Sequence, residues 1–588
     1  MDRIRAEQTD DVNETAHEAT STLSRRGLLK GVGLAALTAG AAGTTAGAAL
    51  AQSAEPDQVY MRSPNNPVIN EAATPTALPS LATIVLNRLA FGPRPGDLAA
   101  FTALGSSDSA RLTAWVDAQL NPAAINDSAC DTRMAAQNFF SLGKSLEQLW
   151  TDHMVYDDLP PAEFTGDAWR WHILPALETE RATLLRATYS QRQLQEVLAD
   201  FWHNHFNVYG WDYWTAPVWV HYDRDVIRGH MLGNFRQMLE AVATSPAMLF
   251  YLDNSSNSRS GPNENYAREL FELHTLGAEN YLGTKSQLSV PGFGEGNPVG
   301  YVDGDVYEAT RCLTGWRVNS NSWENGVTDT GTFLYYEAWH DRFQKIVLGQ
   351  FLSADQGPMV DGRNVLDALA RHPGTGRTIA RKLCRRLIGD TPPQSIVEVA
   401  AALFTAQVDA PDQLKQVVRA IVLSDEFRST WGEKIKRPLE YAVSLLRATQ
   451  AEVMPNDPLI WAYDEMGQGL FNWRAPNGYP DSRAEWSGTM PMLQRWRFNN
   501  SLLEGWIEGS TVDILAQTPA AIRTPNALVD FWSTRILGRA LAPADRAEIA
   551  EFLALGRNVD YDLTQEQIDD RLRHAVGLIL MSPEFMWR

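Results

Sequence analysis

Apolar residues recur every three or four positions along most of the chain, which is the spacing of an amphipathic helix. Residues 84–91 show this pattern, and the Gly- and Pro-rich segment after them interrupts it. The same period returns in residues 107–120, 179–201, 223–243 and 263–276. Alternating apolar and polar residues, the pattern of a half-buried strand, are scarce. The sequence therefore predicts helix in more than about half of the ordered residues and strand in under about a tenth.

Irregular segments interrupt the helical pattern at three places. Gly, Pro and Ser are concentrated in residues 283–304, 319–331 and 476–481. The first of these is long for a connection between two helices, so we interpret it as a candidate lid. The predicted fold is mainly α: a multi-lobed helical protein with long irregular loops and little strand. Residues 81–375 and 376–588 are candidate lobes.

Two segments in the second half of the chain resemble each other. Residues 416–427 and 574–585 share an apolar helical pattern that ends in Ser-Asp-Glu-Phe or Ser-Pro-Glu-Phe. Each follows a predicted helix pair with a Gly- and Pro-containing turn, at 389–393 and 538–543. Two interpretations fit: an internal duplication, or amphipathic helices that look alike because a Ser cap follows each.

A twin-arginine export signal is predicted near the start of the chain. Residues 24–30 read Ser-Arg-Arg-Gly-Leu-Leu-Lys, a weakly apolar run follows, and Ala-Leu-Ala at 49–51 is typical of a cleavage site. The alternative, a membrane anchor, is disfavoured by the Gly, Ala and Thr of the run. We expect a signal peptide at 1–51, a linker at 52–80, and a periplasmic or extracellular protein with no stable membrane anchor after cleavage.

Charge and cysteine content narrow the function classes. The formal net charge of −20 disfavours nucleic acid as a partner, because binding to phosphates draws on clustered Lys and Arg. Cys130, Cys312 and Cys384 are far apart and show no CxxC spacing, so neither a zinc ribbon nor a disulfide framework is indicated. The sequence also lacks a Gly-rich phosphate loop, a dinucleotide fingerprint after a predicted strand, and a GxSxG nucleophile motif.

Histidines and carboxylates gather between residues 200 and 277. A helix that ends near Phe206 would place Asp200 and His203 on one face, with His205 pointing elsewhere. We name His203, His205 and His340 as candidate ligands of a divalent metal such as zinc, iron or manganese. The alternative for each imidazole is a hydrogen-bonded core residue.

A second group of candidates lies on the predicted helix that begins with Asn263 as its N-cap. Carboxylates beside an imidazole could supply both the acid and the base for hydrolysis of a glycoside or ester. The candidate catalytic residues are Glu264, Glu269, His274 and Asp341. The alternative is a surface ladder of ion pairs with Arg268 at helical spacing.

Aromatic residues crowd the segment 202–222. Their rings could form a stacking surface for a sugar, or they could be a core between lobes. The candidate substrate-binding residues are Trp202, Trp211, Trp214 and Tyr266.

A series of longer motifs runs through the chain: Asn87–Gly92, Phe201–Phe206, Asn263–Gly277, Leu313–Trp316, His340-Asp341 with Lys345, Leu366–Pro373, Ala380–Leu383, Gly478–Asp481 and Ser582–Phe585. Together these motifs resemble the bacterial family of unknown function DUF1800, from about Leu81 to Arg588. The loop after Tyr281 is longer than the family pattern. The resemblance implies an exported, mainly helical protein, often encoded beside a second twin-arginine protein of the DUF1501 type, and it implies no established reaction.

These observations lead to two functional hypotheses. The first is an envelope or extracellular hydrolase that acts on a polymer such as a polysaccharide, with metal assistance as an option. The alternative is a non-catalytic envelope protein that binds a co-exported DUF1501-type partner or a glycan, in which the histidines and carboxylates form structural ion pairs.

Overall fold

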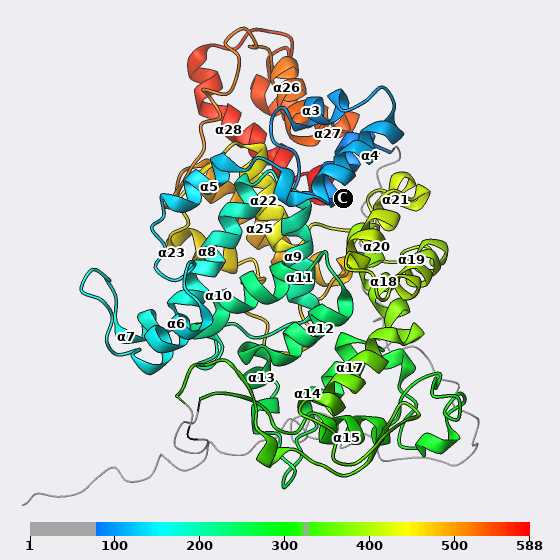
Figure 1. The fold of residues 1–588 in the computed structure, drawn as a ribbon. Helices are drawn as coiled ribbons and strands as arrows, with labels where there is room; N and C mark the ends of the chain where they lie inside the picture. The colour runs from blue at the N-terminus through cyan, green and yellow to red at the C-terminus, as the bar shows by residue number, and fades with distance from the viewer. Residues whose placement is uncertain (1–77, 321–325, 327) are drawn as a thin grey trace, which may run out of the picture. The chain divides into compact units, whose positions relative to one another are not determined.

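Helices and the segments that connect them make up most of the structure. The computed structural model describes residues 78–320, 326 and 328–588. The predicted signal peptide, and the linker up to residue 77, lie outside the described residues. More than half of the chain is helical, and the strands form only short antiparallel pairs (Figure 1). The prediction of a mainly α fold is therefore confirmed.

The first helices are connected by turns and by two longer segments, 136–145 and 151–167. Ser80 and Ser107 each accept a hydrogen bond from a backbone N–H of the first turn, which fixes the start of two of these helices. The predicted period over 179–201 is broken at Ser190, whose backbone is extended and whose hydroxyl donates to Asp127. The helices are α2 (Leu81–Arg88), α3 (Asp97–Ala103), α4 (Asp108–Gln119), α5 (Ser128–Ala135), α6 (Leu146–Trp150), α7 (Ala168–His172), α8 (Leu174–Tyr189) and α9 (Gln193–His205).

The middle of the chain mixes short α-helices with π-helical turns. The α-helices are α10 (Trp219–His221), α11 (Arg228–His230), α12 (Phe235–Thr244), α13 (Pro246–Tyr251), α14 (Asn265–Glu269) and α15 (Asp303–Cys312). The π-helical turns are η3 (Thr151–Val155), η5 (Tyr222–Ile227) and η7 (Leu270–His274). The 3₁₀ turns are η2 (Pro122–Ala124), η4 (Ala216–Val218), η6 (Asn254–Ser256), η8 (Ala278–Asn280), η9 (Gln287–Ser289) and η10 (Glu337–Trp339).

One helix start differs from the prediction. The helix expected at 263–276 begins at Asn265 as α14 and continues as η7, and Glu264 rather than Asn263 is its N-cap residue. Asn263 instead accepts a hydrogen bond from the N–H of Asn265, two residues on, at 3.1 Å. The prediction of Asn263 as the N-cap is wrong because its side chain closes a local turn before the helix starts.

The second half contains the two similar segments. Its helices are α17 (Val360–Arg371), α18 (Pro373–Leu387), α19 (Gln394–Ala406), α20 (Gln413–Val422), α21 (Asp425–Ser429), α22 (Pro438–Ala448), α23 (Asp457–Asp464), α24 (Arg483–Trp486), α25 (Thr489–Leu503), α26 (Pro525–Leu537), α27 (Pro543–Ala554), α28 (Gln565–Met581) and α29 (Pro583–Met586). Helices α18 to α20 contact one another, as do α26 to α28 (Figure 1). Ser424 and Ser582 each cap the short helix that follows. The two segments thus share a helix order as well as a sequence pattern.

Within the residues that the structure describes, the strands form three short antiparallel pairs. They are β1 (Trp316–Val318) with β2 (Phe333–Tyr335), β3 (Lys345–Val347) with β4 (Gln350–Leu352), and β5 (Glu452–Val453) with β6 (Ser510–Thr511). In the β3–β4 hairpin the turn residues Leu348 and Gly349 both have positive φ, as a two-residue type I′ turn requires. This hairpin places Lys345 opposite Leu352.

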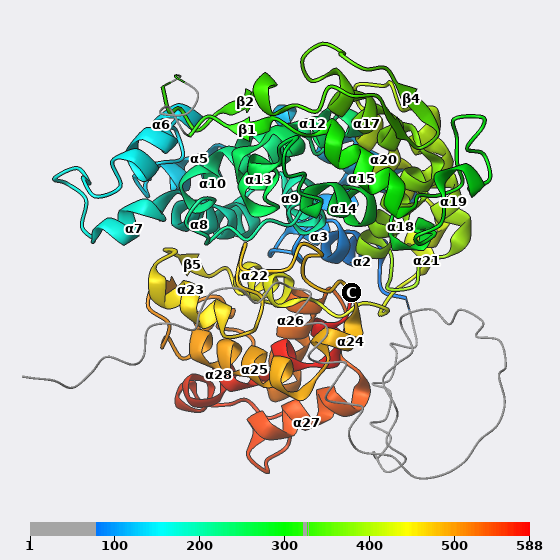
Figure 2. The same cartoon turned by 90° about the horizontal axis from the view of Figure 1, so that it is seen from below.

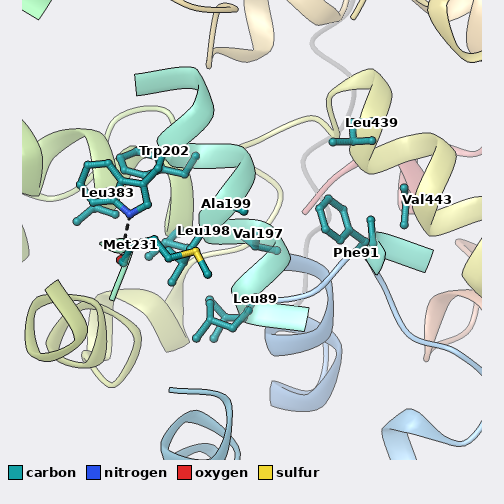
Figure 3. Close-up of a cluster of buried hydrophobic side chains, with 14 of the residues drawn as sticks. Leu89, Phe91, Val197, Leu198, Ala199, Trp202, Met231, Leu383, Leu439 and Val443 are labelled. Carbon is teal, nitrogen blue, oxygen red and sulfur yellow. Dashed lines mark hydrogen bonds between the residues drawn. The ribbon is translucent and has the colours of Figure 1, made fainter. Parts of the chain in front are cut away.

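The buried core is continuous across the two predicted lobes. Side chains of α9 lie between Leu383 of α18 on one side and Phe91 with Leu439 and Val443 of α22 on the other, and the Trp202 indole N–H donates to the carbonyl of Met231 at 3.2 Å (Figure 3). In Figure 2, helices α22 to α28 lie together on one side, and α22 contacts α8. Among the described residues, none of the helices combines the length and the hydropathy that a membrane span requires.

Candidate active site

The C-terminal turn of α9 carries the predicted pair Asp200 and His203. The helix ends at His205, and the N–H of Phe206 donates to the carbonyl of Trp202. Asp200 and His203 line the same cavity, of about 40 Å³, together with residues of α8 and of the segment 468–479. His205 points to another set of neighbours. The prediction that the helix ends here, with Asp200 and His203 on one face, is confirmed. The cavity has room for a few water molecules.

His203 is held by a carboxylate that the sequence analysis did not select. Its Nε2–H donates to Asp223 Oδ1 at 2.9 Å. The Arg228 Nε donates to both oxygens of Asp223 at 2.9 Å, and its two terminal nitrogens each donate to an oxygen of Glu196 at 2.9 Å. We call His203, Asp223, Arg228 and Glu196 the His203 network. It joins α9, η5 and α11.

The charge of Asp223 is fixed by its neighbours. Burial alone would raise the pKa of Asp223, but Arg228, the hydrogen bond from His203 and the nearby Arg186 together hold that pKa well below its usual range. An ionised Asp223 keeps the proton of a neutral His203 on Nε2, so Nδ1 is the nitrogen left to accept a proton. An imidazole oriented by a carboxylate beside a cavity is the arrangement of a general base.

Asp200, on the same cavity, is committed to a different set of ion pairs. It contacts the guanidinium groups of Arg386, at 3.0 Å, and Arg437. The same two arginines contact Glu440, which also receives Arg588 Nη2 at 2.8 Å. All of these arginine side chains are buried. Asp200 therefore has two roles: its ion pairs hold α9 against α18 and α22, and its side chain forms part of the cavity wall.

His205 and His274, both sequence-predicted, lie together around a buried lysine. Lys382 Nζ donates to His205 Nδ1 at 3.2 Å and to the carbonyl of Leu273 at 3.0 Å, while His205 Nε2 donates to the carbonyl of His274 at 3.2 Å. Burial lowers the pKa of Lys382 to about 8, and burial with Lys382 nearby lowers the pKa of His274 to about 3. Neither ring nitrogen of His274 has a hydrogen-bond partner in the described part of the chain.

Glu264 is the N-cap of α14 and Glu269 is its last residue, and neither lines the His203 cavity. The Glu264 side chain is 43% exposed and accepts from Arg268 Nη2 at 3.1 Å. Arg268 also reaches Asp303 at 3.2 Å. The Glu264–Arg268 pair is one step of the ion-pair ladder predicted as the alternative, while the second contact of Arg268 goes to Asp303 on α15. Glu269 is half-buried on the same helix.

His340 and Asp341 belong to a separate buried cluster near the β3–β4 hairpin. His340 Nε2 donates to Asp361 Oδ2 at 3.2 Å, and Lys345 Nζ donates to the same oxygen at 2.7 Å. Lys345 also donates to the carbonyls of Asp341 and Phe343. We call His340, Lys345 and Asp361 the Asp361 network. The Asp341 carboxylate itself is paired with Arg311 at 2.9 Å.

The structure does not bring the three candidate metal ligands together. His203 bonds Asp223, His205 bonds Lys382 and the His274 carbonyl, and His340 bonds Asp361. Within residues 78–320, 326 and 328–588, no three His, Cys, Asp or Glu side chains are grouped so that they could hold a metal ion.

The four candidate substrate-binding rings divide into buried and accessible ones. Trp202 and Tyr266 are fully buried, so they belong to the core. Trp211 is half-buried and donates its indole N–H to the carbonyl of Leu470, a residue of the cavity wall. Trp214 is 43% exposed and stacks on Phe250 at 5.0 Å between ring centroids. Of the four, Trp214 presents the largest surface to solvent.

Sequence reasoning missed several charged residues of the interior. Asp223 stands directly after the aromatic segment, and Lys382 lies inside the motif Ala380–Leu383, so both positions carried a signal. Asp361 stood in no motif that was singled out. The same is true of Glu180 and Asp464, two carboxyls near the cavity wall. Burial raises the pKa of Asp464 to about 6, and burial together with Asp464 raises the pKa of Glu180 well above its usual value.

The predicted lid, residues 283–304, is attached to its surroundings at several points. His372 Nε2 donates to the carbonyl of Pro298 at 2.7 Å, and the Gln287 amide donates to Asp305 and to the carbonyl of Ile346. None of its residues lines the His203 cavity. The loop packs on α17 and β3 instead.

Comparison with known proteins identifies the family of this chain but assigns it no activity. Searches of curated proteins and of solved structures found no match to this chain. A family model described as "Protein of unknown function (DUF1800)" matches residues 84–587. Since this match covers most of the chain, the protein belongs to the DUF1800 family.

Proposed function

We propose that the protein is an exported hydrolase that acts on a polymer such as a polysaccharide, with His203 as its general base. The observation that carries the proposal is the Asp223–His203 pair at the wall of a cavity. A neutral imidazole with its Nε2–H bound to a carboxylate can take a proton at Nδ1 from a water molecule in that cavity. The oxygen of that water then attacks the substrate.

Two features support water as the attacking group. The cavity volume of about 40 Å³ suits water and excludes a sugar ring, so the substrate would present only its reacting bond there. Thr183 and Tyr479 lie on the same wall, and the Thr183 hydroxyl has no hydrogen-bond partner in the described part of the chain. That hydroxyl is available to hold the water in place.

Accessible aromatic rings support a carbohydrate substrate. Tyr213 and Trp214 are each 43% exposed, and Trp169 is 51% exposed. His172 stacks between Trp169 and Tyr213, at 5.2 and 4.3 Å. Rings held by stacking keep a fixed orientation, and their exposed faces can pack against the apolar face of a sugar. The half-buried Trp211 joins this segment to the cavity wall at Leu470.

The test is His203→Gln in the purified mature protein. Its activity on a panel of envelope and plant polysaccharides would be followed by the release of reducing ends. We expect activity of the parent on at least one polymer and a loss of at least about 100-fold in the variant, the usual size of a general-base contribution. His230→Gln is the matched control, because His230 bonds the carbonyl of Val226 and does not line the cavity. Equal activity in His203→Gln and the parent would contradict the proposal.

Export is tested separately from catalysis. Arg25→Lys with Arg26→Lys is expected to trap the precursor in the cytoplasm, because the twin-arginine route reads the two arginines as a pair. Fractionation of cells that produce each form gives the answer. Mature protein outside the cytoplasm from the doubly substituted precursor would refute this route.

One observation favours the second candidate, a non-catalytic envelope protein that binds a DUF1501-type partner or a glycan. His205, His340 and Asp341, all selected from the sequence, are committed to ion pairs or hydrogen bonds inside the fold. Under this candidate, Trp214→Ala would weaken glycan binding while His203→Gln would leave it unchanged, and no polymer would be cleaved.

A further inference from the structure

A second, larger pocket lies on the far side of the His203 network. It measures about 440 Å³ and shares Glu196 and Arg228 with the His203 cavity. Four arginines line it: Arg186, Arg192, Arg224 and Arg228. The carboxylates on its wall are Asp127, Asp131 and Glu196, and two more, Asp223 and Asp225, pair with Arg186, Arg228 and Arg224 without lining the pocket. The concentration of guanidinium groups stands out in a chain whose formal net charge is −20.

Two of the arginines and two of the carboxylates are satisfied within the protein. Arg228 is bound to Asp223 and Glu196 through all of its nitrogens. Arg224 donates to Asp225 and to the carbonyls of Leu142 and Lys144. Asp127 accepts from the Ser190 hydroxyl and from the N–H of Gln191, both at 2.7 Å. These groups form the wall and leave little capacity for a ligand.

The other two arginines keep unused donors. The Arg186 side chain donates no hydrogen bond in the described part of the chain: its Nη1 is buried without a partner, and Asp223 Oδ2 lies 3.7 Å from it. Arg192 donates Nη2 to the carbonyl of Ile125 at 3.2 Å, but its Nε is buried without a described partner. An acceptor in the pocket that reaches both guanidinium groups would use the donors that the protein leaves free.

We propose that this pocket binds an oxyanion of the phosphate class, held by Arg186 and Arg192. A guanidinium fork donates two parallel hydrogen bonds to phosphate or carboxylate. A phosphate dianion has enough oxygens to accept from two arginines at once and enough charge to balance them, whereas a carboxylate satisfies one fork. The pocket is much larger than a phosphate group, so it admits either free phosphate or a phosphate carried by a larger molecule such as a sugar.

The binding of inorganic phosphate to the mature protein tests the proposal by titration calorimetry at low salt. We expect saturable binding at one site, and at least about tenfold weaker binding in Arg192→Gln. The matched control is Arg419→Gln, since Arg419 is an exposed arginine paired with Asp117 and lies outside the pocket. No binding by the parent, or equal binding by the parent and Arg192→Gln, overturns the proposal.

A second variant guards against a folding defect. Arg186→Lys keeps the positive charge beside Asp223 but removes the fork, so it should bind phosphate at least about tenfold more weakly with an unchanged melting temperature. Acetate at the same concentration provides the comparison of anion classes, and binding of acetate as tight as that of phosphate overturns the assignment to phosphate. A hexose phosphate distinguishes the sources: tighter binding than inorganic phosphate indicates a carried phosphate, and equal binding indicates the free anion.

Discussion

The His203 network and the Asp361 network are built from the same kinds of residue and differ in what surrounds them. Each joins a histidine, a cation and at least one aspartate, and each aspartate is buried. The His203 network lies between two pockets, one of about 40 Å³ and one of about 440 Å³. The Asp361 network is sealed: the Lys345 side chain is 0% exposed, and its three protons go to Asp361 and to two carbonyls.

The difference separates a structural ion cluster from a candidate site. In the Asp361 network every donor of Lys345 is used, and the cluster ties the β3–β4 hairpin to α17 and to the segment around His340. In the His203 network Nδ1 of the imidazole is left for another partner, and Arg186 Nη1, near Asp223, has no hydrogen-bond partner among the described residues. Residue type alone does not distinguish the two, because both contain a His–Asp pair. Adjacent space and unused hydrogen-bonding capacity do.

The largest expected effect is on stability, in Asp361→Asn. The substitution preserves shape but removes the nearer counter-charge of the Lys345 ammonium in a sealed site and leaves only Asp341 Oδ1, 3.8 Å away and paired with Arg311, so we expect a loss of about 3 kcal/mol in the free energy of unfolding. Urea unfolding followed by circular dichroism measures it. Asp409→Asn removes an exposed ion pair with Arg371 and serves as the control. A loss below about 1 kcal/mol in Asp361→Asn would show that the cluster is not sealed.

The same substitution in the other network should cost less. Asp223→Asn leaves Arg228 paired with Glu196, and water can enter from either pocket, so we expect a loss of about 1–3 kcal/mol in the same urea experiment. Hydrolase activity should fall with it, because an amide can donate to the imidazole and so favour the wrong tautomer. If Asp223→Asn costs more than Asp361→Asn, the contrast between an open and a sealed network is refuted.

A third buried carboxyl tests what happens without a counter-charge. Burial raises the pKa of Asp464 to about 6, and its Oδ1 has no hydrogen-bond partner among the described residues. A raised folded-state pKa favours the protonated form, so this stabilisation is fully present below pH 4 and is lost as the pH rises through about 6.

Relative to Asp464→Asn, the parent should therefore lose about 2 kcal/mol in the free energy of unfolding between pH 4 and pH 7. Urea unfolding of both proteins across that range measures the difference. Because the amide of Asp464→Asn does not titrate, the pH dependence of this variant comes from all the other titratable groups and can be subtracted from that of the parent. A difference between the two proteins that stays constant with pH would show that Asp464 has a counter-charge or access to water.

Helical periodicity in the sequence predicted some features of the fold and could not predict others. The spacing around Phe201 predicted both the end of α9 and the shared face of Asp200 and His203, because three residues cover most of one helical turn. It could not predict the π-helical turn η7 or the start at Asn265, since these depend on a local side-chain turn and on tertiary packing.

The partners of the candidate residues were not predictable in the same way. Asp223 lies 20 positions from His203, and Lys382 lies 177 positions from His205. Only the packing of η5 and α18 against α9 brings these pairs together. The sequence pointed to the chemical groups, but which group meets which is set by contacts between distant segments.

The smallest expected effect on the free energy of unfolding is that of replacing Glu264, which the sequence analysis selected as a candidate catalytic residue. Its side chain is 43% exposed and that of its ion-pair partner Arg268 is 35% exposed, so solvent screens the pair, and Arg268 can pair with Asp303 instead. Glu264→Gln should change the free energy of unfolding by about 0.5 kcal/mol or less, within the range of exposed helical pairs. Urea unfolding beside Asp223→Asn measures this, and the same preparations give the rate of polymer hydrolysis.

Unchanged hydrolysis in Glu264→Gln with loss in His203→Gln would place the reaction at the α9 cavity. Loss of hydrolysis in Glu264→Gln with unaltered stability would move the reaction to α14 and remove the distinction that the two buried networks draw.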